Sequence, residues 1–222
     1  MYEFVTHTHN HIGGECPHRC NYCYVNNPRF GRPEKYTGPL RLIEKEFSVN
    51  YGEGKTIFME NCNDAFSDKV PIEWIVRIIN HANMFPKNSY VWQTKNPAKY
   101  MELGTDRFHE NSLFGTTIET NRELSFISKA PPMISRISAM ERINRKTFLT
   151  IEPICDFDLS IMIDWIESVN PSFINIGADS KNHGLPEPSW DKVQLLINGI
   201  KELGIEIKEK HNLERLKNVA PF

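Results

Sequence analysis

Short apolar runs alternate with longer amphipathic segments along the chain, and this alternation limits the folds available to it. Each run is rich in β-branched or aromatic residues and is bounded by polar residues, glycine or proline, which is typical of a buried parallel strand. Strands are therefore predicted at residues 3–7, 56–59, 89–92, 112–117, 147–151 and 172–176, with a seventh candidate at 205–208.

The segments between these runs have the spacing of amphipathic helices. Apolar residues recur at helical intervals in 71–83, 159–169 and 190–203, with weaker patterns in 40–47 and 132–144. Strands that alternate with helices in this way indicate a parallel sheet with crossover connections. We therefore predict an α/β fold, a partial or nearly closed (β/α)6 TIM-like barrel, in a single domain over residues 1–222. Its chemistry is expected at the carboxyl ends of the strands.

Composition narrows the class of protein. The formal net charge is −2, so the chain has no global positive field that would attract a polyanion. It contains no apolar run long enough to span a membrane, and residues 1–7 lack the pattern of a signal peptide. The expected location is the cytoplasm, without a membrane partner. In that reducing compartment an odd number of cysteines, five, argues against a disulfide framework.

Three of the cysteines lie close together, just after the first predicted strand. Cys16, Cys20 and Cys23 have the spacing C-x3-C-x2-C, and three thiolates can hold three irons of a cubane cluster, which leaves the fourth iron open. The alternative is a zinc site. Structural zinc needs a fourth ligand, for which His18, His11 and Cys62 are candidates, and the spacing is not that of a zinc knuckle.

The cysteine spacing, with the aromatic Tyr22 before the last cysteine and a strand before the loop, resembles the signature of the radical S-adenosylmethionine (SAM) superfamily. Within it, the chain resembles phage-associated radical SAM proteins of unassigned function, and more weakly spore photoproduct lyase, a DNA-repair member. The matching segments follow the second to fifth strands: Asn61-Cys62-Asn63-Asp64, Thr94-Lys95, Glu119-Thr120-Asn121 and Glu152-Pro153.

The resemblance implies a 4Fe–4S cluster on Cys16, Cys20 and Cys23, with SAM bound to the open iron. In this superfamily an electron from the reduced cluster cleaves SAM to methionine and a 5′-deoxyadenosyl radical, which abstracts hydrogen from the substrate. The substrate is unidentified, with a nucleic acid or nucleotide as the leading class. The reaction also requires an electron donor such as flavodoxin or ferredoxin.

The resemblance also suggests which residues bind SAM. Tyr22 is expected near the adenine, and the backbone around Tyr24 at its edge. The family commonly has a Gly-Gly-Glu-type segment after the second strand for the SAM amino group, and this chain departs from it. The side-chain oxygens of Asn61, Asn63 and Asp64 are the candidates to replace it.

Two charged residues complete the predicted cofactor site. Lys95 follows the third strand, where a cation can pair with the SAM carboxylate, and Glu119 follows the fourth, where a carboxylate can bind ribose hydroxyls. Each has a plainer alternative as a solvated loop charge, and Asp64 has one as a turn or helix-cap residue.

Other residues suggest further roles. Cys62 and Cys155 each follow a predicted strand, so either is a candidate hydrogen-atom donor to a product radical, or simply a small buried side chain. His7, His9 and His11 alternate in an extended segment and can converge on a second metal or contact substrate. A noncatalytic zinc- or nucleic-acid-binding module, or an electron-transfer iron–sulfur protein, is the alternative function.

Overall fold

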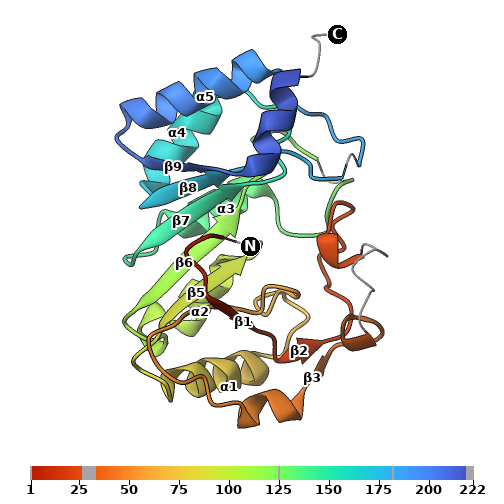
Figure 1. Ribbon diagram of the computed structural model, residues 1–222, viewed down its shortest axis with the longest axis vertical. Helices are drawn as coiled ribbons and strands as arrows, with labels where there is room; N and C mark the ends of the chain where they lie inside the picture. The colour runs from red at the N-terminus through yellow and green to blue at the C-terminus, as the bar shows by residue number, and fades with distance from the viewer. Residues whose placement is uncertain (1, 27–33, 125, 182, 219–222) are drawn as a thin grey trace.

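The computed structural model describes residues 2–26, 34–124, 126–181 and 183–218. Its main sheet has seven strands in the order β1-β4-β5-β6-β7-β8-β9, and every neighbouring pair is parallel. Figure 1 shows the strands rising from β1 below to β9 above. The strands are β1 (His7–His9), β4 (Thr56–Met59), β5 (Ser89–Thr94), β6 (Ser112–Thr117), β7 (Thr147–Ile151), β8 (Phe173–Ile176) and β9 (Glu206–Glu209).

The predicted parallel α/β fold is confirmed, and the seventh candidate strand is β9. The strands follow one another in chain order, as they do in a (β/α) barrel. Among the described residues the recorded pairings do not join β9 back to β1, so closure of the barrel stays a prediction. The extent of the single domain also stays a prediction. None of the described helices is long and apolar enough to cross a membrane.

The strong helix predictions are confirmed to within a residue or two at each end. They correspond to α1 (Ile72–Asn83), α4 (Leu159–Val169) and α5 (Trp190–Glu202). The weaker segment 132–144 contains the shorter helix α3 (Met133–Met140). A further helix, α2 (Ala98–Leu103), was not predicted, because it is only six residues long and shows little periodicity.

Two local predictions are wrong. Residues 40–47 do not form a helix: β3 (Arg41–Leu42) pairs antiparallel with β2 (Ile12–Gly13), and the 3-10 helix η4 (Glu44–Ser48) follows. The first strand lies at His7–His9, whereas Tyr2 and Val5 join a buried apolar cluster. An apolar run therefore correctly indicated burial there, but burial does not require strand pairing.

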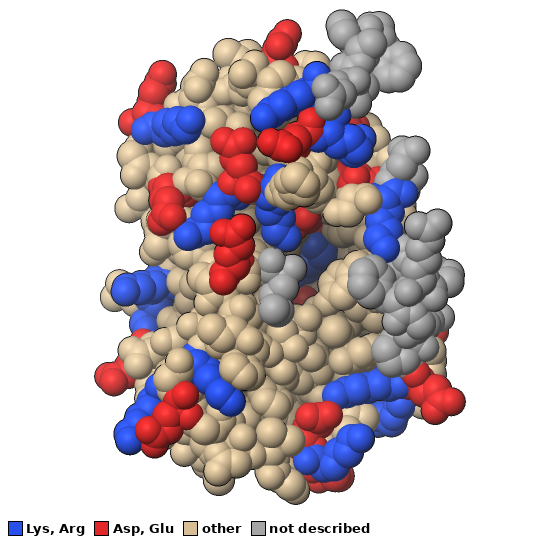
Figure 2. Space-filling view, viewed as in Figure 1, with Lys and Arg blue, Asp and Glu red and all other residues tan. Residues whose placement is uncertain are grey.

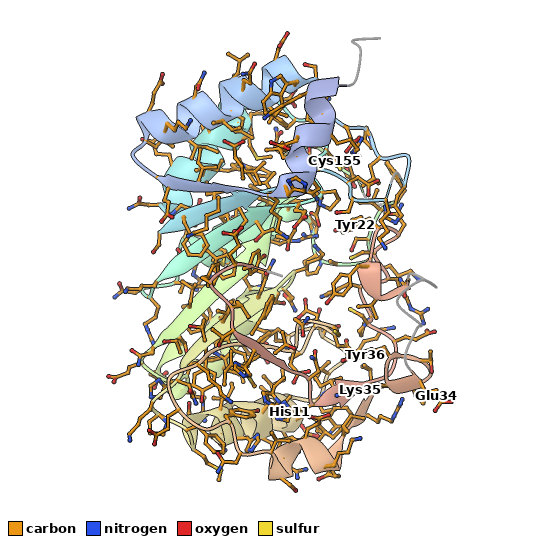
Figure 3. All side chains as sticks on the ribbon, in the orientation of Figure 1. His11, Tyr22, Glu34, Lys35, Tyr36 and Cys155 are labelled. Carbon is orange, nitrogen blue, oxygen red and sulfur yellow. The ribbon has the colours of Figure 1, made fainter. Side chains whose placement is uncertain are left out.

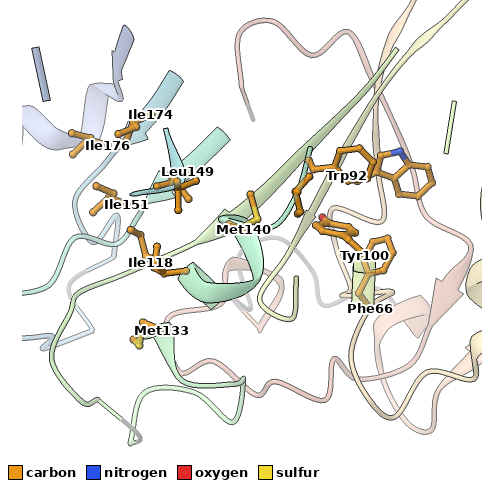
Figure 4. Packing of buried hydrophobic residues seen from close by; sticks show 14 of the residues in the cluster. Phe66, Trp92, Tyr100, Ile118, Met133, Met140, Leu149, Ile151, Ile174 and Ile176 are labelled. Carbon is orange, nitrogen blue, oxygen red and sulfur yellow. The ribbon is translucent and has the colours of Figure 1, made fainter. Parts of the chain in front are cut away.

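The sheet has an apolar cluster on each face. Alternate residues of a strand face opposite sides, and β8 shows this directly, since Ile174 and Ile176 join the larger cluster and Phe173 joins the smaller one. Figure 4 shows the larger cluster, with Ile174 and Ile176 beside Leu149 and Ile151 of β7. The smaller cluster contains Tyr2, Val5, Val91, Phe148 and Phe173.

Candidate active site

The cysteine loop runs from β2 to the short 3-10 helix η1 (Tyr24–Asn26). Cys16, Cys20 and Cys23 line one cavity of about 320 Å³, and Cys62, which follows β4, lines it too. Tyr36, labelled in Figure 3, forms part of the same wall. The structure therefore brings the three predicted cluster ligands to one cavity near the carboxyl end of β4.

The thiols suit an iron–sulfur cluster in kind and in number. Burial raises the pKa of Cys16 to about 12 and also raises the pKa of Cys23, so both are neutral until a cation stabilises the thiolate. Cys20 Sγ lies 3.2 Å from Ser128 Oγ. Over the described part of the chain, no three His, Cys, Asp or Glu side chains stand in a metal-ligating arrangement. Three sulfur donors on one cavity wall nevertheless fit the donor set of such a cluster.

A buried carboxylate anchors the cysteine loop to the sheet. Asp64 Oδ2 lies 2.9 Å from His18 Nε2 and accepts a 2.8 Å bond from the Lys95 backbone, while Thr94 Oγ1 donates to Oδ1 at 2.7 Å. Burial alone would raise the pKa of Asp64, but His18 and these donors outweigh it and lower the pKa. Asp64 thus joins the loop to the ends of β4 and β5; its predicted contact with SAM stays a prediction.

The two asparagines after β4 lie against the start of the cysteine loop and η1. Asn61 Nδ2 donates to the Tyr24 hydroxyl at 3.1 Å, and that hydroxyl donates to the Asn61 carbonyl at 2.8 Å. Asn63 Nδ2 donates to the Gly14 carbonyl at 3.1 Å. The structure therefore brings Asn61, Asn63 and Tyr24 together, and their contacts with SAM remain predictions.

A second buried carboxylate gathers the other predicted cofactor residues. Lys95 Nζ donates to Glu119 Oε1 at 2.7 Å, and the Tyr22 hydroxyl donates to the same oxygen. Arg136 Nη1 donates to Glu119 Oε2 at 3.0 Å. Burial opposes ionisation, yet Lys95 and Arg136 lower the pKa of Glu119 to about 2. Glu119 is therefore a fixed anion, and Lys95 is its ion-pair partner.

Arg136 is a site residue that the sequence did not reveal. It lies on α3, is 1% exposed, and also donates to the carbonyls of Thr117 and Pro131. A buried arginine normally needs an anionic partner. The sequence does show an arginine between apolar residues of the segment that forms α3. Its burial can be understood only from the position of Glu119, which the sequence does not give.

The two predicted hydrogen-donor thiols occupy different surroundings. Cys62 lines the cysteine cavity, with its Sγ 3.5 Å from the Tyr24 hydroxyl. Cys155 is fully buried, and its backbone N–H donates to the Glu119 carbonyl at 2.8 Å. Burial raises the pKa of the Cys155 thiol to about 12. Of the two, only Cys62 is among the residues that line this cavity.

The three alternating histidines do not form a shared ligand set among the described residues. His7 is exposed and bonds Thr6, His9 stacks on Tyr51 with ring centroids 4.1 Å apart, and His11 is fully buried. The strand ends at His9, so the alternation that would have aligned all three stops before His11. The alternative in which they converge on one metal is therefore wrong, and the alternative in which one of them contacts substrate stays a prediction.

Solved structures of spore photoproduct lyase are among those with a similar fold. One is a double mutant with bound AdoMet and dinucleoside spore photoproduct. It superposes with a TM-score of 0.56 at 12% sequence identity, and the match covers 87% of this chain and 60% of that chain. Another, complexed with dinucleoside spore photoproduct, has a TM-score of 0.61 at 11% identity, over 90% of this chain and 75% of that one. At this identity the likeness shows the fold alone, and this chain spans less than two thirds of the first structure.

Sequence comparisons give a family but no characterised relative. No curated protein matches the sequence significantly. One family model matches residues 2–171, which include β1 to β7, the cysteine loop and the Glu119 network. The chain therefore belongs to the family described as protein of unknown function (DUF5131).

Proposed function

We propose that the protein is a radical SAM enzyme in which Cys16, Cys20 and Cys23 bind a 4Fe–4S cluster. The observation that carries the proposal is that three thiols of one C-x3-C-x2-C loop line a single cavity of about 320 Å³. Three thiolates are the number that leaves one iron of the cluster open. The fold likeness to a spore photoproduct lyase with bound AdoMet supports the proposal.

Residues at the carboxyl ends of the strands beside the cysteine loop, which are not themselves part of the cavity lining, would bind and orient SAM. When bound, the reduced cluster supplies the electron that cleaves SAM and so provides the radical for hydrogen abstraction. Glu119, held ionised by Lys95 and Arg136, is suited to accept hydrogen bonds from ribose hydroxyls. Tyr22 shares a bond with that carboxylate, which keeps its ring beside the expected adenosine position.

The amino-acid end of SAM is assigned to the segment after β4. Asn61, Asn63 and Asp64 are the proposed acceptors for the amino group; their side-chain oxygens accept bonds from Asn10, the Asp64 backbone and the Lys95 backbone, respectively. Lys95, whose Nζ donates to Glu119 at 2.7 Å, is the cation proposed for the carboxylate. Cys62 lines the cavity and is the proposed hydrogen-atom donor to the product; Cys155 is the alternative donor.

The proposed substrate is a nucleic acid or nucleotide, and the proposed reductant is a small donor such as flavodoxin or ferredoxin. The substrate class is supported by the dinucleoside spore photoproduct bound to the neighbours of this fold. Figure 2 shows basic and acidic side chains interspersed over one face, and the formal net charge is −2. Recognition of a polyanion would then depend on local contacts rather than on a broad positive field.

Anaerobic reconstitution with iron and sulfide tests the proposal. The wild type should bind about four irons, its reduced cluster should change its EPR spectrum when SAM is added, and 5′-deoxyadenosine should form. Cys16→Ala, Cys20→Ala and Cys23→Ala should each fail to retain the cluster. Cys155→Ala is the matched control for iron content, because Cys155 is buried outside the cavity lining.

Three results would refute parts of this proposal. A colourless protein that binds only zinc would favour the zinc-module alternative. A stable cluster whose EPR spectrum ignores SAM would favour an electron-transfer protein. Retention of the cluster by all three alanine variants would show that the ligands were assigned wrongly.

A further inference from the structure

One hydroxyl from a distant part of the chain lies against a predicted cluster ligand. Ser128 belongs to the connection between β6 and α3, and its Oγ is 3.2 Å from the Sγ of Cys20. Cys20 is 8% exposed and Ser128 is half-buried. Within the described residues, Cys20 is the one predicted cluster ligand whose sulfur contacts a side-chain hydroxyl. The contact therefore singles out one of the three thiols.

Two backbone bonds hold Ser128 in this position. The Asn21 N–H donates to the Ile127 carbonyl at 2.9 Å, and the Lys129 N–H donates to the His18 carbonyl at 2.6 Å. These two bonds flank the cysteine on the loop and the serine on the connection. Figure 1 shows the connection between β6 and α3 reaching the cysteine loop. The hydroxyl thus faces the sulfur because the two backbones are paired around it.

The Ser128 hydroxyl has one hydrogen and two possible acceptors. The Ala130 N–H donates to its Oγ at 3.1 Å, which occupies one lone pair of that oxygen. The His18 carbonyl oxygen lies 3.2 Å from Oγ, as far as the Cys20 sulfur does. That carbonyl already accepts the shorter bond from Lys129. Of the two acceptors, only the sulfur has no other donor among the described side chains.

Iron binding decides between the two acceptors. A free thiol carries its own hydrogen and can donate it to Oγ, but a cysteine that binds iron is a thiolate and can only accept. Sulfur and oxygen 3.2 Å apart would then repel each other unless the hydroxyl supplied the hydrogen. Hydrogen bonds to a charged acceptor are also stronger than those to a neutral one. The hydroxyl hydrogen of Ser128 therefore turns from the His18 carbonyl to Cys20.

We propose that Ser128 donates a hydrogen bond to the iron-bound thiolate of Cys20 and thereby raises the reduction potential of the cluster. The inference rests on the proposed cluster, and Ser128 is a positioning residue that acts through Cys20 without binding iron. Hydrogen bonds to the sulfurs are among the factors that set such potentials. Reduction adds a negative charge to the cluster, so a donor at its sulfur stabilises the reduced state more than the oxidised one.

Burial strengthens this effect and also determines which variants can test it. A hydrogen bond at a buried sulfur acts in a medium of low dielectric constant. Ser128 also lines a second cavity of about 320 Å³, together with Ala130 and Pro131. Water from that side could replace the hydroxyl in Ser128→Ala. Ser128→Val is the better variant, because its methyl group fills the place of the hydroxyl and cannot donate.

A redox titration of the reconstituted protein, followed by EPR, tests the proposal. Ser128→Thr keeps a hydroxyl and should keep the wild-type midpoint potential, whereas Ser128→Val has nearly the same shape as that variant and should have a lower midpoint. At the wild-type midpoint, the ratio of reduced to oxidised cluster should fall about three- to tenfold in Ser128→Val, and tenfold corresponds to about 59 mV for one electron. Ser138→Ala, at an exposed position of α3, is the control and should leave the potential unchanged.

Deuterium exchange provides a second readout. The hydroxyl hydrogen exchanges with solvent, so the Fe–S stretching bands in the resonance Raman spectrum of the wild type should shift in D₂O. Ser128→Thr should keep this shift, and Ser128→Val should lose part or all of it. A change in fold stability alone would not separate these two variants in this way.

Equal midpoint potentials for Ser128→Thr and Ser128→Val would overturn the proposal. If Ser128→Val does not retain a cluster, Ser128→Ala takes its place, and a wild type without any deuterium shift would overturn the proposal as well. A wild type that binds no iron–sulfur cluster would refute this inference together with the proposed function. A cluster that ignores SAM but has a lower potential in Ser128→Val would refute only the radical SAM activity and would support the role of Ser128.

Discussion

The Nε2 atom of His18 lies 2.9 Å from Oδ2 of Asp64, and this contact fastens the middle of the cysteine loop to the edge of the sheet. Both side chains are nearly buried, and Asp64 also holds the Thr94 side chain and the Lys95 backbone. The position of Cys16 and Cys20 on either side of His18 therefore depends on one carboxylate that is remote in sequence.

Asp64→Asn should lower the free energy of unfolding by about 1–3 kcal/mol, because an amide nitrogen takes the place of a buried oxygen that accepts hydrogen bonds, among the contacts with His18, Thr94 and the Lys95 backbone. Urea denaturation of the metal-free protein measures this. Asp164→Asn, at an exposed position of α4, is the control and should stay within about 0.5 kcal/mol of the wild type. Equal stabilities of the two variants would show that the His18–Asp64 contact carries no net energy.

Glu119 should make stability depend on pH in the acid range. Burial opposes its ionisation, but Lys95 and Arg136 lower its pKa from 4.5 to about 2. Because the folded-state pKa lies below the unfolded-state value, the ionised carboxylate stabilises the fold fully when the pH is above about 4.5. This stabilisation is lost as the pH falls from about 4.5 towards 2. The contribution near neutral pH is about 3 kcal/mol. Urea midpoints of the wild type and Glu119→Gln across this range should converge on acidification.

The control for that pH series is Glu141→Gln, which changes an exposed carboxylate near α3. Its urea midpoints should stay parallel to those of the wild type at every pH. A constant difference between the wild type and Glu119→Gln down to the lowest pH would contradict the assigned pKa.

Arg136→Met should destabilise the protein by about 3–5 kcal/mol, since it leaves Glu119 buried with one cation fewer and the carbonyls of Thr117 and Pro131 without a donor. Thermal and urea unfolding provide the measurement. Adding Glu119→Gln should restore part of the loss, because the uncompensated charge disappears. If the two losses simply add, the residues do not interact as the structure indicates.

Gly14→Ala should disturb the start of the cysteine loop strongly. Gly14 has φ +90°, and an added Cβ would lie 2.2 Å from the Pro39 carbonyl oxygen, which is backbone and cannot rotate aside. Gly38→Ala is the matched control, because its φ of +73° carries a similar strain of about 1–2 kcal/mol but nothing lies within 4 Å of the added atom. Gly14→Ala should therefore lose clearly more stability in urea, and equal losses would mean that the close approach to Pro39 is relieved at no cost.

Several features of the fold were predictable because their causes are local in the sequence. The apolar runs that became β4 to β9 and the periodic segments that became α1, α4 and α5 each carry their own signal. The segment at Tyr2 and Val5 shows the limit of that signal, since its apolar residues pack on the sheet rather than pair with it. At Arg41–Leu42, pairing with β2 outweighed a weak helical pattern.

Some features of the candidate site were likewise predictable from local sequence, and others were not. The spacing of Cys16, Cys20 and Cys23 keeps the three residues near one another, because eight residues of one loop cannot separate far, and the structure places all three at one cavity. The positions of Lys95 and Glu119 after strands predicted that they would meet near one edge of the sheet. What the sequence did not predict is that they pair with each other, and that Arg136 joins them from α3.

The sequence by itself determined the alternating α/β pattern and the cysteine loop, because periodicity and spacing act over neighbouring residues. Only the tertiary structure decided which distant polar groups meet, as His18 does with Asp64 and His11 does with Tyr51 and His81. The physical reason is that a buried polar side chain must find a partner, but its sequence neighbours do not say which one. Packing of the whole sheet and its helices makes that choice.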